Sequence, residues 1–127
     1  MSIIEISNDT PAEMLIRLAQ AIHRATGGLP IALKSRERPG VFVDRDGSVH
    51  TDYESEALDR VFTDTARKKV KVDRGKYAGM PMMVSPVENQ EGYPLAAIGV
   101  VDDLGTLSLR EFVEISETIR DQVLNGL

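Results

Sequence analysis

The sequence contains no cysteine, so disulfides, thiolate zinc sites, iron–sulfur clusters and cysteine nucleophiles are all excluded. Basic residues are fewer than acidic ones: the chain has 15 Lys and Arg residues and 20 Asp and Glu residues, which gives a formal net charge of −5. A surface of this sign does not attract a polyanion, so nucleic acid is not expected as a partner. Long hydrophobic runs are missing, and the apolar pair Ile3-Ile4 is interrupted by Glu5. We therefore expect no signal peptide, no membrane span and a cytoplasmic protein.

The length and composition are those of one globular domain. The chain has 127 residues, of which 42% are hydrophobic and 28% are charged. That is enough apolar material for one core but not comfortably for two. Internal repeats and linkers rich in Pro, Gly or Ser are absent. We expect a single domain over residues 1–127.

Three sequence positions have the pattern of a helix start, in which a Ser or Thr is followed three residues later by Glu. In such a capping box the hydroxyl and the carboxylate satisfy two backbone amides that a helix start leaves unpaired. The three pairs are Thr10 and Glu13, Thr51 and Glu54, and Ser108 and Glu111. Apolar residues at spacings of three and four follow each pair. They predict helices over residues 11–26 and about 52–66, and an amphipathic C-terminal helix after Ser108.

Between these helices, short apolar runs separated by turn residues predict strands. The runs cover residues 29–33, 41–43, 48–50, 69–72, 80–87 and 93–101. The Asp46-Gly47 pair predicts a hairpin turn between the second and third runs. The resulting fold class is α+β, with a central antiparallel sheet of about five strands and N-terminal, middle and C-terminal helices. We expect the core to include Ile98, Val100, Phe112 and Ile119.

The sequence also indicates where some strands lie in the sheet. Residues 69–72 alternate lysine and valine, which is typical of a half-buried edge strand. Residues 93–101 are almost continuously apolar, which predicts a central strand covered on both faces, and the small residues Ala96, Ala97 and Gly99 leave room for a helix. Proline cannot donate to a sheet, so Pro81 and Pro86 predict that strand 80–87 is an edge strand or is bulged.

The apolar strand Met82–Val87, a glycine-containing turn and the strand Pro94–Asp102 resemble the final hairpin of GAF, PAS and profilin-like sensory domains. The chain is also similar to a small archaeal family of uncharacterised proteins known mainly from methanogens, through residues 32–36 and 96–102. These resemblances imply a sheet flanked by helices and a sensory role. The bilin-attaching cysteine, a haem-type ligand pattern and the cyclic-nucleotide signature of some such domains are absent. The resemblance thus transfers no site residue and leaves the cofactor open.

The densest charge cluster is residues 67–76, which hold six basic residues and one acidic residue. Such a cluster can bind a phosphate or carboxylate ligand, or an acidic partner surface. The alternative is a solubilising edge strand and loop. For the ligand hypothesis, we expect basic and tyrosine side chains to border a pocket roofed by methionines. The candidate residues are Arg36, Arg74, Lys76, Tyr77, Met80 and Met82.

Other candidate sites have weaker support. Residues 75–79 contain two glycines around Lys76, but the strand–GxxxxGK[ST]–helix context of a phosphate loop is missing. His50 lies near Asp44, Asp46 and Asp52 in the sequence, but a third clear ligand is lacking, so no metal site is predicted. No catalytic residues are assigned, because no nucleophile or acid–base motif is recognisable.

Three functions remain open at this point. The first is a small-molecule-sensing or regulatory ligand-binding domain, with an anionic ligand. The second is a non-catalytic dimerisation or adaptor module, and the third and least supported is an enzyme. The two amphipathic terminal helices carry apolar stripes that one small domain covers only in part, so we also expect a homodimer through one or both helices.

Overall fold

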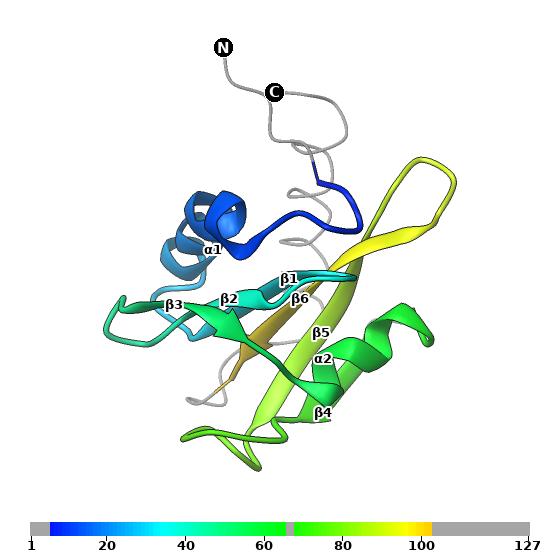
Figure 1. Cartoon of the computed structure of the whole chain (residues 1–127). Coiled ribbons are helices and arrows are strands. Elements are labelled where there is room, and N and C mark those ends of the chain that lie inside the picture. The colour runs from blue at the N-terminus through cyan, green and yellow to red at the C-terminus, as the bar shows by residue number, and fades with distance from the viewer. Residues whose placement is uncertain (1–5, 66–67, 103–127) are drawn as a thin grey trace.

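The computed structural model describes residues 6–65 and 68–102. Its six strands form one antiparallel sheet in the order β3-β2-β1-β6-β5-β4 (Figure 1). The elements are α1 (Ala12–Ala25), β1 (Ile31–Ser35), β2 (Gly40–Val43), β3 (Val49–Tyr53), α2 (Glu56–Asp59), the 3-10 turn η1 (Arg60–Phe62), β4 (Lys68–Lys71), β5 (Pro81–Glu88) and β6 (Pro94–Val101). The α+β class is confirmed, with six strands where about five were expected.

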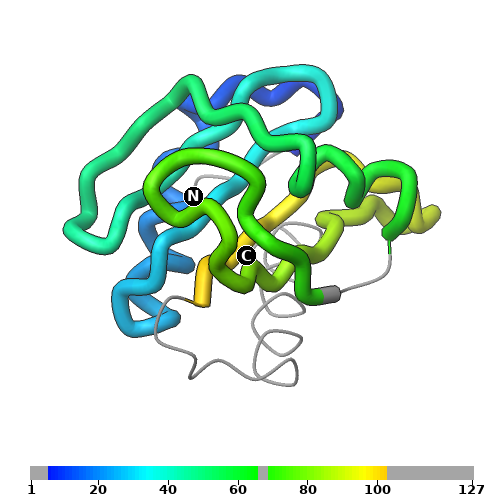
Figure 2. Tube along the Cα trace, turned by 90° about the horizontal axis from the view of Figure 1, so that it is seen from below, coloured from blue at the N-terminus to red at the C-terminus, as the bar shows by residue number. Residues whose placement is uncertain are grey.

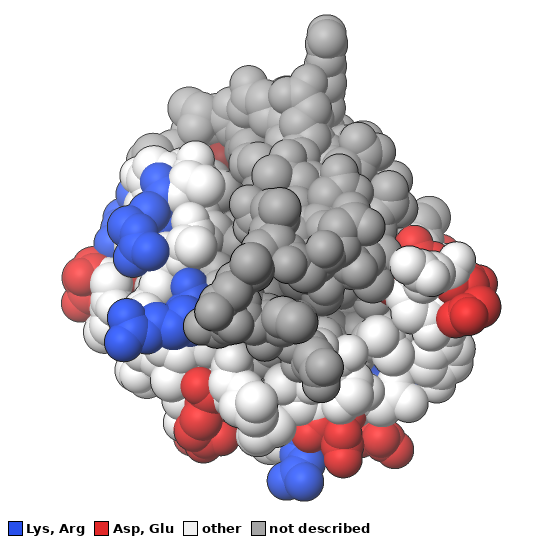
Figure 3. Space-filling view, turned by 90° about the horizontal axis from the view of Figure 1, so that it is seen from above, with Lys and Arg blue, Asp and Glu red and all other residues white. Residues whose placement is uncertain are grey.

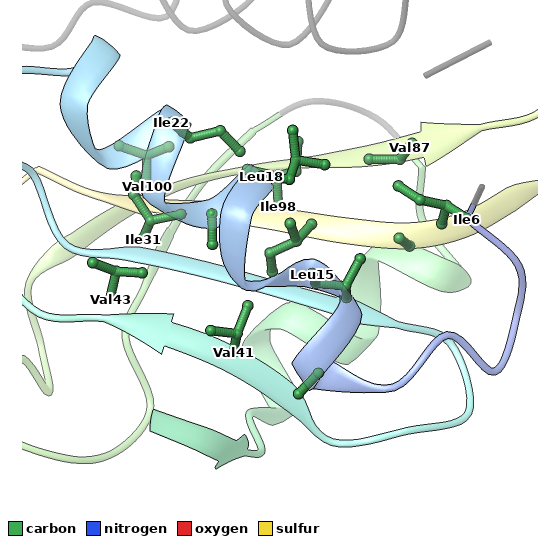
Figure 4. Close-up of a cluster of buried hydrophobic side chains, with 14 of the residues drawn as sticks. Ile6, Leu15, Leu18, Ile22, Ile31, Val41, Val43, Val87, Ile98 and Val100 are labelled. Atoms are coloured by element: carbon green, nitrogen blue, oxygen red, sulfur yellow. The ribbon is translucent and has the colours of Figure 1, made fainter. Parts of the chain in front are cut away.

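The sheet separates two layers of buried side chains. Helix α1 lies on one face (Figure 1), and its apolar stripe packs against β1, β2 and β6 (Figure 4). On the other face lie α2, η1 and the segment of residues 72–80, which is seen in front of the sheet from below (Figure 2). Both faces of the sheet are therefore covered. In the described part of the chain, α1 covers the first face, whereas α2, η1 and the 72–80 segment together cover the second face.

The N-terminal helix is confirmed, but its predicted capping box is wrong. Helix α1 begins at Ala12, and Pro11 rather than Thr10 occupies the N-cap position. The Thr10 hydroxyl instead stabilises the preceding turn, where it accepts a hydrogen bond from the Ser7 amide at 2.7 Å. The expected stripe, which includes Leu15, is buried against the sheet as predicted.

The middle helix is much shorter than predicted, and its predicted start at Thr51 is wrong. Tyr53 pairs with Gly40 of β2, so the chain stays extended through β3. The helix starts only after Ser55, whose side chain accepts a hydrogen bond from the Leu58 amide, and ends at Asp59 before η1. The predicted C-terminal helix after Ser108, with Phe112 and Ile119, lies outside the described residues.

The position of β6 is as predicted, whereas for β5 the edge alternative is wrong and the alternative of a bulge near its prolines has a counterpart. β6 is a central strand in which Ile98 and Val100 are buried. Strand β4 is the edge strand expected from its lysines, and it pairs with β5, so β5 is not at the edge. The β4 pairs reach from Pro81 to Val84 only, which leaves Pro86 beyond them. The irregularity expected near the prolines falls between Val87 and Glu88.

Small residues in β6 admit the middle helix, as the sequence indicates. A Cβ atom added to Gly99 would lie 3.3 Å from Leu58 Cδ1 of α2 and 2.7 Å from Met82 Sδ of β5. The predicted turn at Asp46-Gly47 also forms, and Gly47 takes the positive φ of 89° that this turn needs.

The described part of the chain holds no helix that combines the length and apolarity needed to cross a membrane. Its longest helix, α1, has 14 residues. Seen from above, the side on which α1 lies, basic and acidic side chains both occur around the rim (Figure 3). The visible part of this side is therefore not uniformly basic.

Candidate ligand-binding site

A pocket of about 440 Å³ lies between the β2–β3 hairpin and the segment of residues 72–80, on the sheet face that α2 shares. Ligand pockets in proteins typically measure about 300–1,000 Å³. The hairpin contributes the first part of the lining and the segment contributes the rest. The lining residues are Phe42, Asp44, His50, Asp52, Tyr53, Glu54, Val72, Arg74, Gly75, Lys76 and Tyr77.

Three aromatic rings from three different elements meet in this lining. Phe42 of β2 and Tyr53 of β3 are stacked, with ring centroids 4.9 Å apart and an interplanar angle of 26°. Tyr77 of the segment is tilted against Phe42 at a centroid distance of 6.0 Å. The bulge that shifts the register between Gly40 and Phe42 lets Tyr53 pair with Gly40 while His50 pairs with Phe42. The pocket thus has an aromatic wall supported by the sheet.

One end of the 72–80 segment is fixed to the start of α2 by Asp73. Its carboxylate accepts hydrogen bonds from the Ser55 hydroxyl at 2.6 Å and from the Glu56 amide at 3.0 Å. Burial alone would raise the pKa of Asp73, but these hydrogen bonds outweigh it and hold the pKa below its ordinary value. Asp73 therefore joins the segment to the helix in its ionised form.

The other end of the segment is fixed to the β2–β3 hairpin by Asp44. This carboxylate accepts hydrogen bonds from the Tyr77 hydroxyl and, at 2.7 Å, from the Arg45 amide, and it forms an ion pair with Lys76 at 3.0 Å. Burial by itself would raise the pKa of Asp44, but the hydrogen bonds from Tyr77 and Lys76 lower it overall. Conversely, burial and the bond to Asp44 raise the pKa of Tyr77. The two carboxylates hold the segment over the aromatic wall.

The lining carries both signs of charge, and its two cations differ in their partners. Lys76 is paired with Asp44, and this hydrogen bond raises the pKa of Lys76. The Arg74 guanidinium makes one long hydrogen bond, from Nη1 to the Glu54 carbonyl at 3.5 Å. Asp52 and Glu54 are exposed residues of the lining, in and just after β3. Arg74 is therefore the cation in the lining that is most available to an incoming anion.

The structure brings three of the six candidate residues together and separates the others. Arg74, Lys76 and Tyr77 line the pocket. Met82 does not roof the pocket: it lies on the same sheet face, but its side chain is fully buried beside Gly99, in the cluster that includes Leu58 of α2. Met80 also lies outside the lining and is 37% exposed at the end of the segment.

Arg36 lies at a different place, beside η1. Its guanidinium carbon is 5.5 Å from the Phe62 ring centroid and 5.1 Å from that of Tyr93. The basic cluster is also divided, because Lys69 and Lys71 are exposed on β4, away from the pocket lining. Arg67 lies outside the described residues. The cluster therefore serves partly as the solubilising edge strand and partly as pocket lining.

Sequence reasoning missed the aromatic wall and the role of Asp44. Phe42 reads as an ordinary core residue of a short strand, and Asp44 reads as part of a turn. His50 and the nearby aspartates do not form a metal site in the structure: the described residues contain no group of three His, Asp or Glu side chains that could hold an ion. These residues form one site because the β2–β3 hairpin and the 72–80 segment lie close together in the fold, which is a tertiary feature that the sequence does not show.

Comparison with known sequences places the chain in a family. Residues 22–104 match the DUF2111 family, described as an uncharacterized protein conserved in archaea. The chain belongs to this archaeal family. It is also 38% identical over 104 residues to the uncharacterized protein MJ0405 of Methanocaldococcus jannaschii, a match that covers 78% of this chain and 75% of that protein. The expected archaeal family is thereby confirmed, and every residue of the pocket lies within the family match.

Proposed function

We propose that this chain is a small-molecule-binding domain with a sensing or regulatory role, and that its ligand is an anion held in the pocket between the β2–β3 hairpin and residues 72–80. The observation that carries the proposal is the convergence of Arg74, Lys76 and Tyr77 on a pocket of about 440 Å³ with an aromatic wall. Mostly apolar pockets with a few convergent polar groups are the usual form of small-molecule sites. A cytoplasmic location is part of the same proposal.

The resemblance to GAF, PAS and profilin-like sensory domains supports the proposal. Such domains pair an antiparallel sheet with flanking helices, and this chain has helices on both faces of its sheet. Fold resemblance alone does not establish function, however, because one fold hosts many functions. The argument for binding therefore depends on the pocket and its lining.

The proposal is tested by a thermal-shift screen against a library of anionic metabolites. A ligand that binds only the folded state adds about 2.7 kcal/mol of stability at one hundred times its dissociation constant. We expect at least one carboxylate or phosphate compound to raise the melting temperature. The gain should disappear in the Arg74→Ala/Lys76→Ala variant and persist in the matched Lys69→Ala/Lys71→Ala variant, whose lysines lie on the exposed edge strand.

Two results would contradict the proposal. The first is a library in which no anion stabilises the protein. The second is a gain that survives the double substitution in the pocket, because charge-assisted contacts from Arg74 and Lys76 are the expected source of ligand orientation.

A dimerisation or adaptor module is the second candidate function. It is favoured by the outer strands β3 and β4, each of which is paired on one side only in the part of the chain that the structure describes. The stripe of α1 favours it less, because the sheet covers that stripe and leaves Met14 as its large exposed apolar residue. We expect a homodimer by light scattering at micromolar concentration, and a monomer would contradict this candidate.

A further inference from the structure

We infer that the ligand of this pocket carries a flat aromatic ring joined to its anionic group. The inference rests on the proposed function, because it concerns the same pocket, and it specifies the chemical class of the ligand. It is drawn from the distribution of aromatic residues in the fold, which is independent of the basic residues that indicate an anion.

The chain has few aromatic residues, and they are concentrated at this site. It contains three Phe, three Tyr and no Trp. Three of these six residues line the pocket: Phe42, Tyr53 and Tyr77. They come from β2, β3 and the 72–80 segment, so the fold assembles them rather than the local sequence. Aromatic rings pack best against other rings in stacked or edge-to-face geometry. A wall of this kind favours a planar ring over an aliphatic chain of equal size.

The Tyr53 hydroxyl adds a polar group to this wall. It is buried, and no group in the described residues makes a hydrogen bond with it. Burial raises the pKa of Tyr53, and the nearby Ser55 hydroxyl offsets this only in part. A buried phenol without a partner is unusual in folded proteins. The structure thus leaves this hydroxyl without a hydrogen-bond partner among the described residues, beside the stacked rings of Phe42 and Tyr53.

The anionic group is expected beside the ring rather than in place of it. Arg74 belongs to the same lining as the three rings, and its guanidinium is only weakly engaged. The carboxylates of Asp52 and Glu54 share the lining and oppose a highly charged ligand. An aromatic compound with a single carboxylate or phosphate therefore matches both parts of the pocket.

The test compares three probes that differ in one property each. 2-Naphthoate has the ring and the charge, decahydro-2-naphthoate has the same carbon skeleton without aromaticity, and 2-naphthamide has the ring without the charge. The protein is labelled with ¹³C at its tyrosine rings, which give three signals. Tyr53 and Tyr77 line the pocket, whereas Tyr93 lies outside the lining and serves as an internal control.

We expect 2-naphthoate to shift the Tyr53 and Tyr77 signals but not that of Tyr93, and to bind at least ten-fold more tightly than its saturated analogue. Phe42→Leu should weaken 2-naphthoate by about five-fold or more. Phe62→Leu is the matched control, because Phe62 is equally buried on the same sheet face but outside the lining. Should Phe42→Leu fail to fold, the comparison of the two naphthoates on the unmodified protein still decides the question.

The outcomes separate this inference from the proposed function. Equal affinity for 2-naphthoate and its saturated analogue would overturn the ring inference and leave the anion pocket standing. Equal affinity for 2-naphthoate and 2-naphthamide would overturn the proposal that the ligand is an anion and would leave the ring inference standing. Failure of all three probes to shift any tyrosine at 10 mM or so would overturn both.

Discussion

The ion pair between Lys34 and Asp59 is asymmetric, and this asymmetry predicts unequal effects of removing its two members. Lys34 lies on the central strand β1 with 4% of its side chain exposed, whereas 45% of the Asp59 side chain is exposed. The two charged groups are 2.8 Å apart, and the ammonium is also 5.4 Å from the Phe62 ring centroid. Nearly all of the desolvation cost therefore belongs to Lys34.

Loss of one partner of a buried ion pair costs about 3–5 kcal/mol, because the other charge stays buried without compensation. For Asp59→Ala we expect a loss of about 2–3 kcal/mol, since water can reach the ammonium through the exposed side of Asp59 and the Phe62 ring still faces it. Lys34→Met removes the buried charge and keeps the apolar stem. Its stability should stay within about 1 kcal/mol of the unmodified protein.

Urea unfolding followed by far-ultraviolet circular dichroism measures these differences. In the double variant Lys34→Met/Asp59→Ala, the loss caused by Asp59→Ala should largely disappear, because no buried charge remains. Lys71→Met on the exposed edge strand is the matched control and should change stability by less than about 0.5 kcal/mol. If Lys34→Met destabilised the fold as much as Asp59→Ala does, the reasoning from desolvation would be refuted.

Two further predictions concern the packing of α2. Gly99→Ala should cost about 1–3 kcal/mol, because the new methyl group would meet Met82 at 2.7 Å in a fully buried site; an unchanged urea midpoint would contradict this. The lowered pKa of Asp73 means that its bonds to Ser55 and Glu56 stabilise the fold above about pH 4 and are lost as the pH falls through the folded value. Asp73→Asn should therefore reduce stability at neutral pH and flatten its decline in acid; an identical acid profile would count against this role.

Much of the fold could be predicted from the sequence where a single local signal acted alone. Apolar spacing of three and four defined α1 to within one residue at each end, and the continuous apolar run of β6 indicated its central place. The predicted start of the middle helix is wrong because a local capping pattern competes with a non-local strand pairing. Thr51 is a good helix cap, but the pairing of Tyr53 with Gly40 keeps the chain extended until Ser55. A sheet partner distant in sequence outweighed the local preference.

The candidate site shows why part of a pocket is predictable and the rest is not. Arg74, Lys76 and Tyr77 are neighbours in sequence, so one charged segment was enough to indicate them. The contact between Tyr77 and Asp44 joins positions 33 residues apart, and it depends on where the hairpin and the segment lie on the sheet. Met82 is expected to roof the pocket, as a methionine that can fill irregular apolar space. It lies on the right face of the sheet, but its side chain is fully buried beside Gly99 in the cluster that includes Leu58 of α2, which no local pattern reveals. The charge pattern identifies the cations of the pocket, whereas the aromatic wall depends on the register of β2 and β3 and on the position of the 72–80 segment. If that wall selects the ligand, the specificity of this protein resides in residues whose sequence pattern is that of an ordinary core.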